Sequence, residues 1–179
     1  MQHNDQYKDI LKQEIKLKLI EKYVEDGDVL KWGKLLFPYK FKGDFCYTLH
    51  QYLVDIMYDE MTVVLAPRGS GKTILGCFLI PIYLALNHPD KYRHFLSIQS
   101  TYKKAVGINT NIRDEIANND LLKAYYGNLV SKHWTKDQFE LTTGVVFTSI
   151  GCEGSLRGLN YKNYRPDYVV IDDLYDEND

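Results

Sequence analysis

The apolar positions of this chain follow two periods, one typical of helices and one typical of strands. In residues 5–26, apolar side chains recur near every third or fourth position, and lysines and glutamates fill the gaps. The same spacing recurs in four further segments: residues 47–57, 74–86, 101–118 and 120–126. We therefore predict a helix in each, with Gly27 ending the first and Pro81 kinking the one that contains it. Residues 28–45 are rich in aromatic residues, lysine, glycine and proline, which predicts an irregular stretch.

Short apolar runs between these segments predict strands. They are residues 61–65, 93–99, 138–141, 145–150 and 168–171. The sequence Thr142-Thr143-Gly144 suits a turn between the third and fourth runs, so these should form a small hairpin insertion. Because strands otherwise alternate with helices, the order predicts an α/β fold with a mainly parallel sheet. The last run is apolar throughout, which predicts a central strand buried on both faces.

The composition is that of one globular domain with no strong charge. The chain has 179 residues, 45% of them hydrophobic and 26% charged, and a net charge of −2. There is no global basic field, so a nucleic-acid surface would have to be a local patch. The lysine-rich residues 5–26 have two interpretations. They form either a basic arm that faces DNA or a protein partner, or an ordinary solvated helix.

The sequence also predicts the compartment. Its N-terminus has no apolar signal-peptide core, and the apolar run at residues 74–86 is too short to span a bilayer. Cys46, Cys77 and Cys152 show no metal or redox spacing, which predicts buried thiols in a reducing environment. We expect a cytoplasmic protein that is neither secreted nor bound to a membrane.

The stretch at residues 66–73, Ala-Pro-Arg-Gly-Ser-Gly-Lys-Thr, indicates a phosphate-binding P-loop between a strand and a helix. Gly69 and Gly71 allow backbone conformations in which successive N–H groups can face phosphate oxygens. Lys72 is expected at the β- and γ-phosphates, and the Thr73 hydroxyl at Mg²⁺. The predicted nucleotide-binding residues of the loop are Pro67, Arg68, Gly69, Ser70, Gly71, Lys72 and Thr73. The pattern asks for glycine where Ala66 stands, and the alternative is a chance glycine turn before a core helix.

Two aspartates directly after the last predicted strand complete the expected site. The carboxyl ends of parallel strands are where such sheets bind ligands, so Asp172 and Asp173 should meet the P-loop. Asp172 is expected to hold Mg²⁺ with Thr73, and Asp173 to polarise the attacking water as general base. Glu177 is the alternative catalytic carboxylate, because many hydrolysing P-loop motors carry glutamate after the metal-binding aspartate.

Four further residues have candidate roles. Arg68 could contact the γ-phosphate in cis, and Arg157 could reach the nucleotide of a neighbouring subunit as an arginine finger. The alternative for Arg157 is a structural ion pair with Glu153 or Asp172. His50 and Gln51 lie on a helix upstream of the loop, where P-loop motors often read adenine; the alternative is that both are ordinary helix-surface residues.

Several stretches together resemble the ATPase half of the large terminase subunit of tailed bacteriophages. They are the P-loop with its Pro67-Arg68 pair, residues 97–105 with 112–116 and 119–122, residues 151–158, and residues 165–173 with the acidic tail 176–178. The likeness covers roughly residues 45–179. It implies a three-layer P-loop NTPase core of the RecA-like (ASCE) type over residues 45–179, preceded by a helical extension and linker over residues 1–44.

The resemblance also implies function and partners. It implies Mg²⁺-dependent ATP hydrolysis that drives double-stranded viral DNA into a procapsid, in the cytoplasm of an infected host. The implied partners are a portal protein, a small terminase subunit and further copies of the chain in a ring. The family's coupling strand and nuclease domain have no counterpart after the two aspartates, so nuclease activity is not expected from these residues. A missing part or a separate chain would supply it.

Two alternatives to a self-sufficient motor stay open. One is a nucleotide-binding assembly module that is inactive until a partner chain completes its site. The other is half of a different P-loop DNA motor, such as a helicase, although residues 97–122 favour the terminase. ATP binding without turnover, converted to turnover by a partner, would indicate the assembly module.

Overall fold

The computed structural model describes residues 2–41, 47–57, 61–154 and 159–174, with side chains from residue 8 onward. Its helices are α1 (Gln2–Glu25), α2 (Val29–Leu36), the 3₁₀-helix η1 (Pro38–Phe41), α3 (Tyr47–Met57), the π-helix η2 (Ile74–Leu79), α4 (Ile80–Asn87), α5 (Tyr102–Asn118) and α6 (Asp120–Tyr126). Its strands are β1 (His94–Gln99), β2 (Val130–Trp134), β3 (Gln138–Leu141), β4 (Val146–Gly151) and β5 (Tyr168–Ile171). No described helix is long and apolar enough to cross a bilayer.

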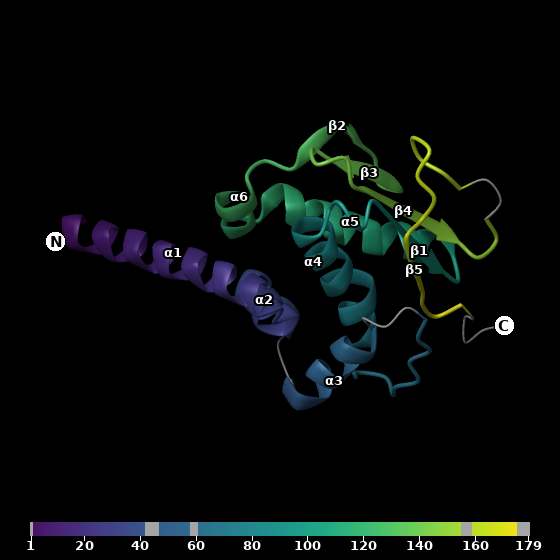
Figure 1. The fold of residues 1–179 in the computed structure, drawn as a ribbon, viewed down its shortest axis with the longest axis horizontal. Helices are drawn as coiled ribbons and strands as arrows, with labels where there is room; N and C mark the ends of the chain where they lie inside the picture. The colour runs from purple at the N-terminus through teal and green to yellow at the C-terminus, as the bar shows by residue number, and fades with distance from the viewer. Residues whose placement is uncertain (1, 42–46, 58–60, 155–158, 175–179) are drawn as a thin grey trace.

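The five strands form one open, mixed sheet in the order β2-β3-β4-β1-β5, and the fold is α/β (Figure 1). β1 pairs in parallel with both β4 and β5, whereas β3 pairs antiparallel with β2 and β4. The predicted hairpin is confirmed, because β3 and β4 pair across the turn at residues 142–144. It is not a separate insertion, however, since β4 also pairs with β1, and the sheet is therefore mixed rather than mainly parallel.

The hydrophobic core lies on one face of this sheet. Phe95, Phe147 and Phe139 stack on neighbouring strands, with ring centroids 4.9 Å apart in each adjacent pair. Helix residues such as Ile112 of α5 and Leu79 of η2 belong to the same buried cluster. On the opposite face, the irregular segment 159–167, which contains a tight turn between Tyr161 and Tyr164, contacts His94 and Glu140. In the described part of the chain, this irregular segment takes the place of a third layer of helices.

Residues 28–45 were expected to be irregular, and this expectation is wrong for their described part. Asp28 caps α2 by accepting a hydrogen bond from the Lys31 N–H at 2.9 Å. Trp32 of α2 is fully buried, and its indole N–H donates to the Tyr126 hydroxyl of α6 at 2.9 Å. Gly33 is required for this packing, because a Cβ there would lie 2.2 Å from Leu79 Cδ1. Burial in the core, rather than helical propensity, stabilises α2.

Two strand predictions need correction. Residues 61–65 form no strand, and Met61, Val63 and Leu65 are 96%, 85% and 93% exposed. β5 is parallel as expected, but it is the edge strand rather than a central one, with Val169 and Ile171 at least half exposed. Both segments are apolar enough for a buried strand. Among the described residues, however, no strand pairs with residues 61–65 or with the outer edge of β5.

Pro81 lies where η2 passes into α4. The Leu75 N–H bonds to the Gly71 carbonyl four residues back, at 2.9 Å, whereas the Ile80 N–H bonds to the Leu75 carbonyl five residues back. Because proline has no N–H, it cannot make the next bond of the ladder, and the wider π-turn ends just before it. The helix that follows the glycine loop is therefore continuous but locally widened.

Candidate nucleotide site

The glycine-rich loop forms a tight turn that leads into a helix. The Ser70 N–H donates to the Pro67 carbonyl at 3.2 Å, and Gly69 at the third position has φ +78°. Such a turn requires positive φ at this position, which glycine adopts without strain. Gly71 has φ +83°, and helical structure begins at Lys72. The first N–H groups of the helix therefore lie at the loop, where a helix N-terminus favours anions.

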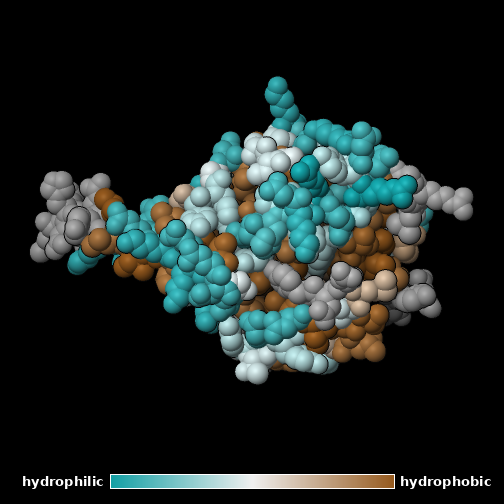
Figure 2. Space-filling view, in the orientation of Figure 1, coloured by the Kyte–Doolittle hydropathy of each residue, from teal (hydrophilic) through white to brown (hydrophobic). Residues whose placement is uncertain are grey.

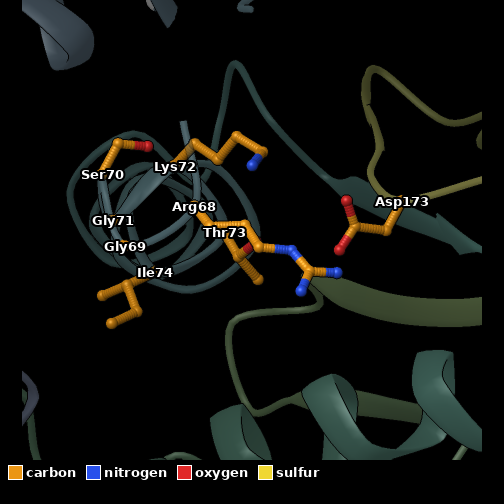
Figure 3. A pocket seen from close by; sticks show the side chains of 8 residues that line it. All are labelled: Arg68, Gly69, Ser70, Gly71, Lys72, Thr73, Ile74 and Asp173. Atoms are coloured by element: carbon orange, nitrogen blue, oxygen red, sulfur yellow. The ribbon is translucent and has the colours of Figure 1, made fainter. Parts of the chain in front are cut away.

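The loop lines an open cavity of about 310 Å³ (Figure 3). Its lining residues are Arg68, Gly69, Ser70, Gly71, Lys72, Thr73, Ile74 and Asp173. In Figure 3 the Arg68 side chain extends toward the Asp173 carboxylate, and the Lys72 ammonium lies on the same side of the loop. The Lys72 ammonium donates to the Ala66 carbonyl at 3.4 Å. The Ser70 hydroxyl is buried at this cavity and has no hydrogen-bond partner in the described part of the chain.

Thr73 and Asp172 meet although they are far apart in the sequence. The Thr73 hydroxyl, at the start of the helix, donates to Asp172 Oδ2, at the end of β5, over 2.7 Å. The backbone N–H of Asp172 bonds to the Ile98 carbonyl of β1, which anchors the end of β5. A hydroxyl and a carboxylate are hard oxygen ligands, so this pair fits Mg²⁺, which binds few protein groups alongside phosphate and water.

Two residues behind this pair were not predicted. The Cys77 thiol lies 3.6 Å from Asp172 Oδ2, and the Gln99 side-chain amide lies 3.8 Å from the Cys77 sulfur. Burial, together with the nearby Asp172 carboxylate, raises the pKa of the Cys77 thiol above its usual range, so it carries its proton. The sequence signal was the spacing of Cys77, four residues after Thr73 and hence on the same side of the helix.

Asp173 has a strained backbone. Its φ is +45°, in a region that non-glycine residues rarely adopt, and its carbonyl accepts a hydrogen bond from the Ser100 N–H at 3.2 Å. Backbone strain of this kind clusters at functional sites, where the surroundings hold it in place. The turn separates the two aspartates: Asp172 contacts Thr73, and Asp173 lines the cavity.

His50 and Gln51 have structural contacts of their own. His50 is buried against the loop, and a Cβ on Gly71 would lie 2.9 Å from His50 Nε2. The Gln51 amide donates to Asp55 at 2.8 Å, one turn further along α3. Their contact with adenine stays a prediction.

Arg157 and Glu177 lie outside the described residues, as does Cys46. Glu153, one of the partners considered for Arg157, accepts a hydrogen bond from the Tyr102 N–H at 3.0 Å. Its own backbone N–H and that of Tyr102 lower the pKa of this carboxyl. Cys77 is buried as expected, whereas Cys152 is exposed, because it lies in the turn that follows β4.

Comparison of the chain with protein-family models, characterised proteins and solved structures found no match.

Proposed function

We propose that this chain is the ATPase motor domain of a terminase-like DNA-packaging enzyme, which binds ATP at the glycine loop and hydrolyses it. The observation that carries the proposal is the 2.7 Å hydrogen bond between Thr73 and Asp172. It joins the residue after the loop lysine to the first of two acids that follow a strand. A glycine turn that arose by chance would not be expected to bring Thr73 and Asp172 together.

The residues around the cavity suit each part of the chemistry. The loop N–H groups and Lys72 bind the phosphates. Thr73 and Asp172 hold Mg²⁺, which would neutralise charge on the phosphate oxygens. Asp173 lines the cavity as an exposed carboxylate and orients the attacking water. Arg68 adds positive charge on the side that faces Asp173 (Figure 3).

The wider function is proposed from the family resemblance. It comprises translocation of double-stranded viral DNA into a procapsid, with a portal protein, a small terminase subunit and a ring of identical chains as partners. An arginine finger from Arg157 and a catalytic role for Glu177 belong to this proposal.

The test is Mg²⁺-dependent ATP hydrolysis by the purified chain at rising protein concentration. We expect turnover that Lys72→Ala abolishes and that Asp173→Asn lowers by about 10²-fold or more. Asp9→Asn removes an exposed carboxylate of α1 and serves as the matched control. Turnover that survives both site substitutions would overturn the proposal. A rise steeper than linear with concentration would indicate a site shared between subunits.

One observation favours a second candidate, a nucleotide-binding assembly module. The exposed apolar segment 61–65, and the outer edge of β5, which has no strand partner among the described residues, suit a sheet that another strand completes. The module would bind ATP with the same residues but turn over only with a partner chain. Nucleotide binding without hydrolysis by the isolated chain would favour it over the self-sufficient enzyme.

A further inference from the structure

A line of buried side chains leads from β1 to the proposed metal site. Gln99 ends β1 and is 2% exposed; Cys77 lies on η2 and is also 2% exposed. The Gln99 amide nitrogen lies 3.8 Å from the Cys77 sulfur, and that sulfur lies 3.6 Å from Asp172 Oδ2. The three groups therefore connect the ends of two strands with the loop helix, and two of them, Gln99 and Cys77, are buried.

The chemistry of the groups fixes the direction of these contacts. The Gln99 amide nitrogen can only donate, so the Cys77 sulfur accepts from it. An ionised carboxylate can only accept, so the thiol hydrogen is directed at Asp172. Asp172 Oδ2 thus accepts hydrogen bonds from two groups of one helix, the Thr73 hydroxyl and the Cys77 thiol. The second donor is independent of whatever else the Thr73 oxygen binds.

We infer that Cys77 is a positioning residue of the metal site, and that its thiol, oriented by Gln99, holds the Asp172 carboxylate in the direction that Mg²⁺ requires. The inference rests on the proposed function. It assigns to Cys77 no contact with nucleotide or metal, and its effect passes entirely through Asp172. A carboxylate that accepts fewer hydrogen bonds is less well oriented, and the supporting groups around a metal ligand commonly tune metal affinity.

The experiment measures how much Mg²⁺ tightens nucleotide binding. A fluorescent ADP analogue is titrated with and without Mg²⁺, and the ratio of the two dissociation constants is compared among variants. Cys77→Ala removes the donor and should reduce this ratio roughly two- to tenfold, the range expected for one hydrogen bond. Cys77→Ser keeps a donor at nearly the same place on the side chain, so it should retain most of the ratio. Metal-free affinity should stay unchanged in both.

A matched control separates the thiol from general packing. Ser97 lies two residues before Gln99 on the same face of β1, and its buried hydroxyl has no hydrogen-bond partner in the described part of the chain. Ser97→Ala removes one buried polar atom from the same strand as Gln99. The ratio of the dissociation constants with and without Mg²⁺ should not change in this variant. Gln99→Met removes the amide that orients the thiol and should lower the ratio.

Each outcome decides the inference. An unchanged ratio in Cys77→Ala, equal losses in Cys77→Ala and Cys77→Ser, or a parallel loss of metal-free affinity would overturn it. If Cys77→Ala does not fold, Gln99→Met decides, and an unchanged ratio there counts against the inference. If the unsubstituted chain binds no nucleotide at all, the proposed function fails as well. If it binds with a clear Mg²⁺ effect that Cys77→Ala retains, only the role of Cys77 fails.

Discussion

Replacing Gly71 by alanine tests how the loop is held. The substitution forces a residue with a Cβ into φ +83°, which costs about 1–2 kcal/mol. It also puts the new Cβ 2.9 Å from His50 Nε2, and overpacking of a buried contact costs about 1–3 kcal/mol. Alanine restricts the unfolded chain and so returns about 0.4–1 kcal/mol. We therefore expect Gly71→Ala to lower the free energy of unfolding by about 3 kcal/mol.

The contribution of His50 can be separated from that of the backbone. In a His50→Ala background the contact is absent, so the added cost of Gly71→Ala should fall to about 1 kcal/mol. Gly69→Ala is the matched control, because Gly69 has φ +78° but no atom lies within 4 Å of its Cβ position. Its cost should be about 1 kcal/mol in both backgrounds.

Urea unfolding of the single and double variants measures these values as a double-mutant cycle. A Gly71→Ala variant as stable as the unsubstituted chain would show that neither strain nor overpacking acts at this position. An equal cost of Gly71→Ala with and without His50 would show that the packing of His50 against the loop contributes nothing.

Two further predictions concern packing and pH. Gly33→Ala should destabilise the chain by about 1–2 kcal/mol in urea unfolding, because its Cβ would lie 2.2 Å from buried Leu79 Cδ1. Gly107→Ala, at a helical position with open space around it, should instead stabilise the chain by up to about 1 kcal/mol. Similar effects of Gly33→Ala and Gly107→Ala would contradict the close packing of Gly33 against Leu79. Burial lowers the pKa of His94, which bonds Thr148 in the folded state, so unfolding takes up a proton as the pH falls below 6.5. The stability due to neutral His94 is thus present above that pH and lost below it. His94→Gln should therefore flatten the fall in unfolding free energy between about pH 7 and about pH 5. An unchanged dependence of the unfolding free energy on pH in His94→Gln would refute this role of His94.

The meeting of the two aspartates with the loop could be predicted from the sequence. It follows from a rule of topology: parallel strands place their carboxyl ends at one edge of the sheet. Asp173 in the cavity and Asp172 at Thr73 agree with that rule. The contact between Cys77 and Asp172 depends on how deeply the helix packs onto β5, which no residue spacing specifies.

The fold was harder to predict where neighbours decide the outcome. Residues 61–65 have the composition of a strand, but a strand forms only where another pairs with it. β5 is apolar throughout, yet its place at the edge depends on which strands lie beside it. α2 was missed because it is only eight residues long and contains Gly33, which weakens the helical signal, while Trp32 and its buried neighbours stabilise the helix through tertiary packing.

Isothermal titration calorimetry with excess Mg²⁺ measures ATP binding at the glycine loop directly. We expect one ATP per chain and an affinity at least about tenfold weaker in Lys72→Ala, because a charge-assisted hydrogen bond contributes about 1.5–3 kcal/mol. Lys16→Ala removes an equal charge from the exposed face of α1 and should leave binding unchanged. No binding by the unsubstituted chain, or equal binding by Lys72→Ala, would rule out the glycine loop as an ATP site.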